Sequence, residues 1–287
     1  GSSCEPDVLS GGFMKRWMIF ALEVVLLLSG CAAEKENAAP EASGMLTVGT
    51  ETQRSFLQDN VFRSDQGDIH YSSSIPVSYD GSEPYALFIT LPGWEGLYFQ
   101  GVGANMVEDF GPEAARRNEK MIVISPQLND WGETSAKQTI ALTEFLMETY
   151  NIDPDRVYLE GYSGGGETGS LVMGMNPELY AAYLMVSSKW DSDLELLAQV
   201  RIPVYLVTGE NDSYYGSDSM KQAYAALSEL YAQQGLSDAE IDALLVLDIK
   251  DQSYFTQRGY ADQHMGGMAI AKDDAIMSWL FRNTGKD

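Results

Sequence analysis

One serine lies among four glycines in the segment GYSGGG, residues 161–166. An apolar run over residues 156–160 predicts a strand before it, and residues 167–175 are compatible with a helix after it. Strand, Gly-x-Ser-x-Gly and helix in this order are typical of a nucleophile elbow, in which small flanking residues permit a sharp turn that exposes the serine hydroxyl. The spacing therefore predicts Ser163 as a nucleophile. A phosphate-binding loop also uses such glycines, but it needs a lysine after them and none is present.

A serine nucleophile needs a general base, and the chain has only two histidines, His70 and His264. In proteins with this elbow the acid and then the histidine follow the serine along the chain, which selects His264. His264 lies in a glycine-flanked loop, residues 259–267, just before the last predicted helix. His70 lies in an early predicted strand, and we interpret it as a surface residue of that strand.

The acid of the predicted triad should follow a late strand, and residues 203–208 form a suitable apolar run. The loop after this run has the sequence GENDSYYG and contains Asp212, which we predict to orient His264 and stabilise its charged form. Glu210 is the alternative because it lies two residues nearer the strand end, and Asp218 is a third candidate. The acidic loop could also be merely solvated or hold an incidental cation.

Backbone N–H groups that bind a developing oxyanion are expected at two places. Gly164 follows the nucleophile, and the start of the next helix adds partial positive charge there. Trp94 lies in the loop after the predicted strand 85–91, and its N–H is the second predicted donor; the alternative is an ordinary turn with a core tryptophan. Trp94, Tyr162 and Trp190 are the predicted substrate contacts, and the alternative for Trp190 is a core or surface position.

Apolar runs of strand length alternate with segments of helical periodicity. This alternation predicts the α/β class: a mainly parallel sheet with helices on both faces and the site at the carboxyl ends of the strands. Residues 74–79 are predicted as an early antiparallel strand. Residues 217–251 are predicted to start as a helix and pack on the fold, so we expect no large lid domain. The predicted parallel strands are residues 85–91, 121–125, 156–160, 183–187 and 203–208, with helices over residues 142–150 and 276–280, the latter capped by Asp273 or Asp274.

The N-terminal part of the chain differs from the rest in composition. Residues 1–13 are interpreted as a leader or added segment. Residues 14–30 have a basic start, a short apolar run and small residues before Cys31, which resembles a bacterial lipoprotein signal whose cysteine carries the lipid; the alternative is a buried helix. Residues 31–44 have no aromatic or β-branched residue and predict a flexible tether. We therefore expect one domain over residues 45–287, lipid-anchored to a bacterial membrane outside the cytoplasm.

Charge and cysteine content exclude several classes of function. The formal net charge is −24, which repels nucleic acid and anionic lipid head groups, so we do not expect nucleic acid as a partner. The only cysteines, Cys4 and Cys31, precede the predicted domain. The domain therefore has no disulfide framework and no cysteine-ligated metal site.

The run DPDRVYLEGYSGG, residues 153–165, resembles the D-P-x-R-V-Y-x-x-G-x-S-x-G-G sequence of α/β-hydrolases. It is most similar to the group of esterase D, feruloyl esterases and polyhydroxybutyrate depolymerases, and to prolyl oligopeptidase catalytic domains. The chain order of the candidate nucleophile, acid and base agrees, and the resemblance covers roughly residues 85–281. It departs at residues 92–93, where Pro-Gly replaces the His-Gly that is frequent in the oxyanion loop of these families.

The resemblance implies an α/β-hydrolase fold and hydrolysis of a carboxylic ester through an acyl-serine at Ser163, with no cofactor and no metal. The expected partner is a small-molecule or oligosaccharide ester, of which the sequence specifies neither the acyl nor the alcohol part. One alternative is a serine peptidase of the prolyl oligopeptidase type, although such proteins usually carry a propeller domain before the catalytic one. Another is a non-catalytic binding lipoprotein, which the presence of all three triad residue types disfavours.

Overall fold

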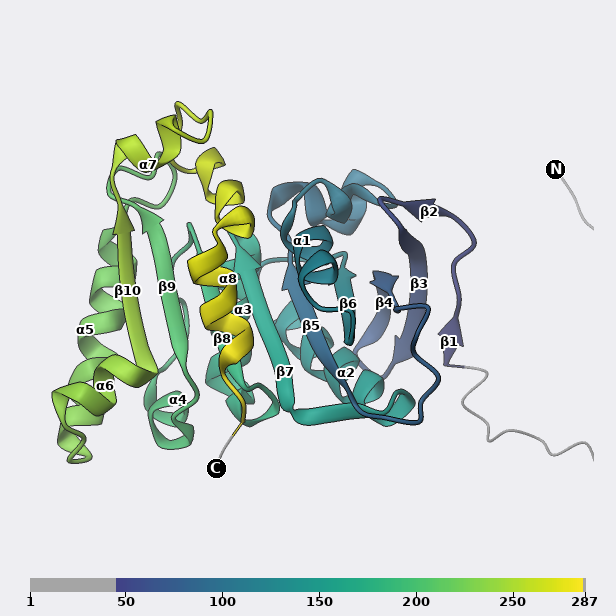
Figure 1. The fold of residues 1–287 in the computed structure, drawn as a ribbon, viewed down its shortest axis with the longest axis horizontal. Helices are drawn as coiled ribbons and strands as arrows, with labels where there is room; N and C mark the ends of the chain where they lie inside the picture. The colour runs from purple at the N-terminus through teal and green to yellow at the C-terminus, as the bar shows by residue number, and fades with distance from the viewer. Residues whose placement is uncertain (1–44, 286–287) are drawn as a thin grey trace, which may run out of the picture. The chain divides into compact units, whose positions relative to one another are not determined.

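The computed structural model describes residues 45–285, which build one mixed sheet with helices on both faces (Figure 1). The predicted signal segment 14–30, the lipidation site Cys31 and the tether 31–44 lie outside the described residues. The strands in chain order are β1 (Leu46–Thr47), β2 (Thr52–Gln53), β3 (Phe56–Ser64), β4 (Gly67–Ser74), β5 (Tyr85–Leu91), β6 (Met121–Pro126), β7 (Ile152–Tyr162), β8 (Ala182–Val186), β9 (Val204–Gly209) and β10 (Leu245–Lys250).

The sheet has an antiparallel and a parallel part. Its strand order is β1-β3-β4-β6-β5-β7-β8-β9-β10, and β2 pairs with β3 outside this path. Strands β5 to β10 pair in parallel, whereas β1 to β4 pair antiparallel with their neighbours. All residues of β5, β6 and β8 are buried, as expected for central strands with helices on both sides.

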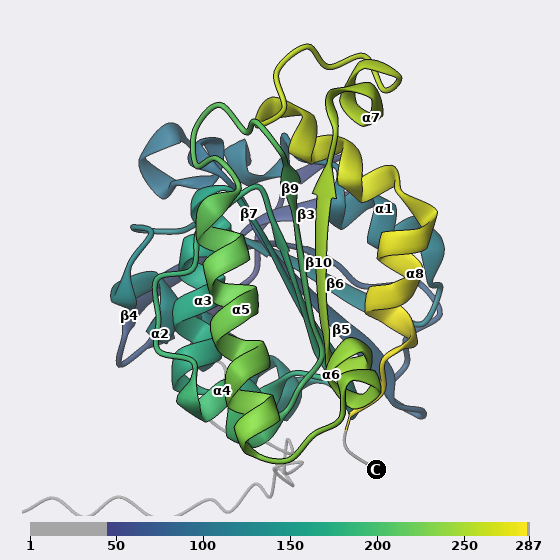
Figure 2. The same ribbon diagram turned by 90° about the vertical axis from the view of Figure 1, so that its left-hand side faces the viewer.

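Helices form two layers, one on each face of the sheet (Figure 2). The first layer consists of α2 (Glu133–Thr149), α3 (Gly164–Met175), α4 (Glu195–Val200) and α5 (Asp218–Gln233), and the second contains α1 (Phe110–Arg117) and α8 (Asp274–Arg282). The other helical segments are α6 (Asp238–Leu244), α7 (Gln252–Thr256) and the 3-10 turns η2 (Trp94–Gly96), η3 (Tyr98–Gln100), η4 (Ala104–Met106), η5 (Pro177–Leu179) and η6 (Met265–Lys272).

Each helical layer buries its own hydrophobic core against the sheet. Leu146, Met173 and Leu227 belong to the core on the α2–α5 side. Phe110 and Met277 belong to the core on the α1–α8 side. Because both faces are covered, the ends of the parallel strands are the places where chemically active side chains can meet solvent.

The predicted α/β class, with a mainly parallel sheet and helices on both faces, is confirmed, and all five predicted parallel strands are present with ends that differ by at most four residues. The structure contains the predicted helix near the C-terminus as α8, and Asp273 caps it by accepting hydrogen bonds from the N–H groups of Ala275 and Ile276. Among residues 45–285 there is no separate lid domain.

Two predictions need correction. Residues 74–79 are not a strand, because β4 ends at Ser74 and a turn follows in which the Tyr79 N–H donates to the Pro76 carbonyl; Pro76 itself has no N–H to offer to a neighbouring strand. Residues 217–251 pack on the fold as predicted, but they include β10, an edge strand that pairs with β9 alone.

Membrane-spanning helices and metal-binding clusters are both absent from residues 45–285. None of the described helices is long and apolar enough to span a bilayer. Residues 45–285 also contain no group of three or more histidine, cysteine or acidic side chains placed to hold a metal ion.

Candidate active site

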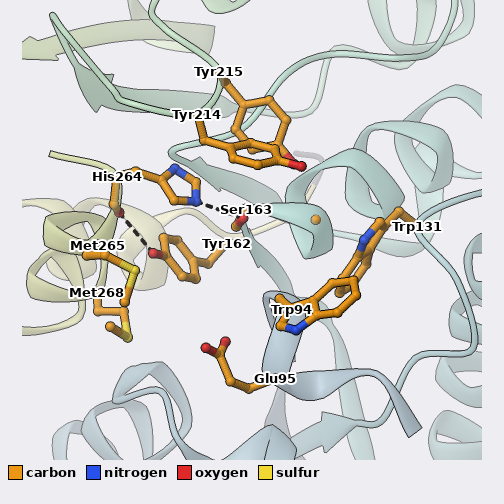
Figure 3. A pocket seen from close by; sticks show the side chains of 11 residues that line it. Trp94, Glu95, Trp131, Tyr162, Ser163, Tyr214, Tyr215, His264, Met265 and Met268 are labelled. Atoms are coloured by element: carbon orange, nitrogen blue, oxygen red, sulfur yellow. Dashed lines mark hydrogen bonds between the residues drawn. The ribbon is translucent and has the colours of Figure 1, made fainter. Parts of the chain in front are cut away.

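Ser163, His264 and Asp212 come together at the carboxyl ends of the parallel strands, and Figure 3 shows the contact between Ser163 and His264. Ser163 Oγ lies 3.0 Å from His264 Nε2. On the other side of the imidazole, His264 Nδ1 lies 3.1 Å and 3.0 Å from the two carboxylate oxygens of Asp212. The nucleophile-to-base and base-to-acid distances both fall within hydrogen-bond range, so the three predicted residues have the mutual geometry of a triad.

Ser163 occupies a strained position between β7 and α3. Its φ of 55° and ψ of −125° lie in a region that residues with side chains rarely adopt. Gly165 permits this tight turn, because a Cβ at that position would lie 2.0 Å from the carbonyl oxygen of Leu91 at the end of β5. The glycines therefore fix one conformation and bring α3 close to the sheet, as the elbow pattern predicts.

Asp212 is the carboxylate that contacts His264. Its side chain is fully buried, and Oδ1 also accepts hydrogen bonds from the N–H groups of Tyr214 (2.9 Å) and Tyr215 (2.8 Å). Burial opposes ionisation, but the hydrogen bonds from His264 and the two N–H groups outweigh it and hold the pKa of Asp212 below its usual value. Asp212 is therefore an anion beside the imidazole.

The two other acids considered for this role lie elsewhere. Glu210 is exposed in the loop after β9, and its carboxylate has no hydrogen-bond or ion-pair partner among the described residues. Asp218 starts α5, is almost fully exposed and pairs with Lys221 at 3.6 Å. Only Asp212 of the three candidates reaches the imidazole.

The predicted oxyanion donors lie at the two loop ends beside Ser163. Within residues 45–285, neither the Gly164 N–H nor the Trp94 N–H donates a hydrogen bond, so both are available to a ligand. A Cβ at Gly93, the residue before Trp94, would lie 3.4 Å from Ser163 Cβ, which shows how closely this loop approaches the serine. Pro92-Gly93 therefore supplies the close backbone approach despite its departure from His-Gly.

A buried carboxyl group that the sequence did not indicate supports this loop. Glu108, between η4 and α1, accepts a hydrogen bond from the Gly93 N–H at 2.5 Å, while its second oxygen has no partner among the described residues. Burial raises the pKa of Glu108 to about 8, the Gly93 hydrogen bond opposes this shift, and the nearby Glu95 adds to it. Glu108 is therefore mainly protonated at neutral pH.

A second buried carboxyl group lies near Glu108. Glu160 in β7 accepts a hydrogen bond from Thr90 Oγ1 at 2.6 Å, and its other oxygen has no partner in the described part of the chain. Burial raises the pKa of Glu160 well above its usual value, and the proximity of Glu108 raises it further. Two neutral carboxyl groups thus lie in the region of β5, β7 and the oxyanion loop.

Ser163 opens into a pocket with a cavity of about 270 Å³. Its walls are mainly aromatic and include two methionines from the segment after His264 (Figure 3). Trp94 is 56% exposed and Tyr214 is 74% exposed, so both also form the rim. The lining residues are Trp94, Glu95, Trp131, Tyr162, Ser163, Gly164, Tyr214, Tyr215, His264, Met265 and Met268.

Tyr162 lines the pocket as predicted and also positions the base. Its hydroxyl donates a hydrogen bond of 2.9 Å to the carbonyl of His264, and the two rings stack with their centroids 5.7 Å apart. Trp190 was wrongly predicted as a pocket wall. Its indole N–H donates to the Ser192 carbonyl, and its ring packs edge-on against Tyr183 in the core on the α2–α5 side, outside the pocket.

His70 is in an early strand, β4, as predicted, but it is not a simple surface residue. Its Nδ1 lies 2.6 Å from a carboxylate oxygen of Asp59, and its ring stacks on Tyr98 at 4.0 Å between centroids. It does not line the pocket of Ser163.

Glu167, in the first turn of α3, reaches the site through a tyrosine. The Tyr215 hydroxyl donates a hydrogen bond to its carboxylate, and Lys189 Nζ lies 3.3 Å from the second carboxylate oxygen. Glu167 therefore holds a pocket-lining tyrosine in place, in addition to its favourable position at a helix N-terminus.

Sequence reasoning missed several lining residues. Trp131 follows β6, and Glu95 follows β5, both at the carboxyl ends of parallel strands, so the rule that pointed to Trp94 could have found them. Tyr214 and Tyr215 follow the predicted acid directly, and Met265 follows the predicted base. No sequence signal indicated Glu108, which acts on backbone rather than on a reacting group.

A family comparison covers the central part of the chain. The sequence profile of the prolyl oligopeptidase family, Peptidase_S9, matches residues 127–252. The match includes Ser163 and Asp212 and ends before His264. No curated protein matches the sequence.

Solved structures of several hydrolases share the fold. A thermostable esterase is similar with a TM-score of 0.65 and 20% identity, covering 80% of this chain and 63% of its own. Oligopeptidase B from Leishmania major gives a TM-score of 0.53 at 14% identity, covering 83% of this chain and 36% of its own. An S-formylglutathione hydrolase from Agrobacterium tumefaciens gives 0.52 at 14% identity, covering 82% of this chain and 98% of its own. The chain thus spans less than two thirds of the first two structures.

These similarities agree with the sheet order and with the strained serine between β7 and α3. At such low identities the solved structures are evidence for the fold alone. The family profile adds a sequence match that includes the turn around Ser163. On this basis the chain has an α/β-hydrolase fold, and its residues 127–252 are similar to the prolyl oligopeptidase family.

Proposed function

We propose that the protein is a serine hydrolase that cleaves carboxylic esters through an acyl-serine intermediate. The observation that carries this proposal is the unbroken contact from Ser163 Oγ to His264 Nε2 and from His264 Nδ1 to the buried Asp212, opening into a pocket. The esterase and the S-formylglutathione hydrolase named above, which share the fold, support it. The proposed reaction needs no cofactor or metal.

In the first half of the reaction, Ser163 Oγ attacks the ester carbonyl carbon while His264 Nε2 takes the hydroxyl proton. The carbonyl oxygen becomes an oxyanion, which the N–H groups of Gly164 and Trp94 are proposed to bind. Asp212 stabilises the imidazolium that forms. The bond to the alcohol oxygen then breaks, His264 returns its proton to that oxygen, and the alcohol leaves an acyl group on Ser163.

In the second half, water replaces the alcohol. His264 takes a proton from the water as its oxygen attacks the acyl carbon, and the oxyanion forms again in the same position. The bond to Ser163 Oγ breaks, His264 returns the proton to the serine, and the carboxylic acid leaves. The serine, imidazole and aspartate end as they began.

The assignment is tested with p-nitrophenyl esters and the Ser163→Ala variant. We expect kcat to fall by about 10⁴ or more while the protein remains folded by circular dichroism. A fluorophosphonate probe should label the wild-type protein at Ser163 and leave the variant unlabelled. Hydrolysis by purified Ser163→Ala at near wild-type rates would overturn the assignment, and absence of labelling in the wild type would favour a non-catalytic binding protein.

The second candidate function is a serine peptidase, which the Peptidase_S9 match favours. The same triad would attack an amide carbonyl, and His264 would protonate an amine instead of an alcohol. Matched p-nitrophenyl esters and peptide p-nitroanilides separate the two functions. A larger kcat/KM on the anilides would replace the esterase proposal with the peptidase.

We further propose that Cys31 carries a lipid and that residues 31–44 tether the domain to a bacterial membrane outside the cytoplasm. The sequence pattern before Cys31 supports this proposal. In a bacterial expression host, the wild-type protein should be found in the membrane fraction, and Cys31→Ala should move it to the soluble fraction. Equal membrane association of both proteins would contradict a lipid at Cys31.

A further inference from the structure

Glu95 is the acidic side chain that lines the pocket of Ser163. It lies in η2, directly after the predicted oxyanion donor Trp94, and its carboxylate points into the space below Ser163 (Figure 3). Within residues 45–285 this carboxylate has neither a hydrogen-bond partner nor an ion-pair partner. Glu95 is exposed to solvent, so its carboxylate is accessible to a positive charge on a substrate that enters the pocket.

The rest of the pocket suits a cation with apolar substituents. Trp94, Trp131 and Tyr214 present aromatic rings, whose faces attract ammonium groups, and Met265 and Met268 add apolar, polarisable surface. Among the described residues, no lysine or arginine lines the pocket. Aromatic rings combined with one carboxylate are a usual environment for quaternary ammonium ligands.

Negative charges outside the pocket also favour a cationic substrate. Asp212 lies buried behind His264, and Asp262 accepts a hydrogen bond of 2.8 Å from the N–H of the pocket residue Met265. The whole chain carries a formal net charge of −24. A pocket within such a field concentrates cations and repels anionic substrates.

The mechanism indicates which part of the substrate carries the charge. His264 must return its proton to the leaving alcohol, so the alcohol lies on the His264 side of the scissile bond. Met265 and Met268 continue from His264 on this side, and Figure 3 shows the Glu95 carboxylate between these methionines and Trp94. We propose that the pocket selects esters whose alcohol part carries an ammonium group, which Glu95 and the aromatic walls bind.

This inference rests on the proposed esterase function and is tested with two isosteric esters. Acetylcholine and 3,3-dimethylbutyl acetate differ by one atom, a charged nitrogen against a neutral carbon. For the wild-type protein we expect kcat/KM to be about tenfold higher for acetylcholine at low ionic strength, and this preference to shrink in 1 M NaCl. In Glu95→Gln the preference should fall to about twofold, mainly through the KM for acetylcholine, and the aromatic rings should account for what is left.

Glu210→Gln is the matched control, because it makes the same charge change on an exposed loop at the same edge of the sheet, outside the pocket. We expect this variant to keep the tenfold preference. Equal kcat/KM values for the two esters in the wild type would overturn the inference, as would an undiminished preference in Glu95→Gln.

A binding measurement separates this inference from the esterase proposal. Phenyltrimethylammonium should quench the tryptophan fluorescence of Ser163→Ala, since Trp94 and Trp131 line the pocket, and Glu95→Gln in the same background should weaken binding about tenfold. If p-nitrophenyl acetate is hydrolysed but neither isosteric ester is and the cation does not bind, the inference fails and the esterase proposal stands. If no ester is hydrolysed and yet the cation binds through Glu95, the esterase proposal fails and the pocket assignment stands.

Discussion

Asp212 and Glu108 are two buried carboxylic acids on different sides of the active site, and their hydrogen-bond donors differ in number. Asp212, on the His264 side, receives hydrogen bonds from the imidazole and from two backbone N–H groups. Glu108, beside the oxyanion loop, receives one hydrogen bond, from the Gly93 N–H, and its second oxygen has none from the described residues. Burial alone raises the pKa of both groups, and only Asp212 has enough donors to reverse the effect.

The difference shows that burial does not decide the charge of a carboxyl group in this site. An anion is stable behind His264 because three donors replace the lost water. Beside the oxyanion loop a neutral carboxyl group can accept the Gly93 hydrogen bond without placing a negative charge near the developing oxyanion. Each carboxyl group therefore has the charge state that the proposed reaction needs at its position.

The largest expected effect comes from removing the charge at Asp212. Asp212→Asn should lower kcat by about 10⁴, because a neutral amide neither stabilises the imidazolium nor holds the correct tautomer of His264. Glu108→Gln is the matched change on the other side, and we expect less than about a threefold loss, since a neutral amide oxygen still accepts the Gly93 N–H. Steady-state rates on a p-nitrophenyl ester measure both. A similar loss in the two variants would remove the distinction between an ionised and a neutral carboxyl group.

A smaller effect on kcat is expected when the Gly93 N–H loses the acceptor that Glu108 provides. Glu108→Ala leaves the Gly93 N–H without its partner and frees the loop that carries Trp94, so we expect kcat to fall about 10- to 100-fold with little change in KM. Because Glu108→Gln keeps the acceptor, it should restore nearly full activity. If alanine and glutamine variants are equally impaired, the role of Glu108 as a positioning residue is wrong.

The same contrast explains which residues the sequence could predict. Ser163 and His264 follow a strand and precede the last helix in a recognisable order, so position along the chain selected them. Position alone made Asp212 the preferred acid but left Glu210 and Asp218 open. Glu108 acts through the backbone of Gly93, fifteen residues earlier, and no local pattern encodes its burial by the folding of η4 and α1 over β5. Supporting groups of this kind depend on tertiary packing.

The buried central strands of the fold could be predicted from the sequence, whereas the edge strand β10 and the packing of Trp190 could not. The strands β5, β6 and β8 are buried on both faces and therefore have continuous apolar sequences. β10 is an edge strand with mostly half-buried residues, and its sequence LVLDIK contains two charged residues, so it escaped prediction. Trp190 follows β8 as a pocket residue would, but hydrogen bonds from its indole to Ser192 and from its backbone N–H to Ser219 hold it partly buried against the core instead.

The pH dependence of stability tests the charge states of Glu108 and Asp212 independently of any measurement of catalysis. The pKa of Glu108 rises from 4.5 to about 8 on folding, so the folded state binds more protons between these values and the free energy of unfolding should decrease as pH rises from 4.5 to 8. Urea denaturation at pH 5 and pH 8 should show a decrease of roughly 3 kcal/mol, and a smaller one in Glu108→Gln. The control Glu210→Gln should keep the wild-type difference.

Asp212 contributes to the pH dependence of the free energy of unfolding with the opposite sign and at lower pH. Its pKa is lowered by folding, so its contribution to stability is present above its ordinary value of 3.8 and is lost as pH falls below it. Asp212 therefore does not contribute between pH 5 and pH 8, and the difference between the wild type and Glu108→Gln over this range isolates Glu108 from the other titrating groups. The same change in the free energy of unfolding in the wild type and in Glu108→Gln would indicate that Glu108 is not protonated.

The smallest expected effect concerns Glu160, and it distinguishes a neutral carboxyl group from a charged one. Thr90→Val keeps the side-chain shape and removes the Oγ1 donor, which lies 2.6 Å from Glu160. If Glu160 is protonated, the loss of one hydrogen bond between neutral groups should lower the free energy of unfolding by about 1 kcal/mol at pH 6, with kcat unchanged. If Glu160 is ionised, an anion is left buried without this donor, and the loss should exceed about 3 kcal/mol. Because Glu160 lies near Glu108, a large loss would also contradict a neutral region beside the oxyanion loop.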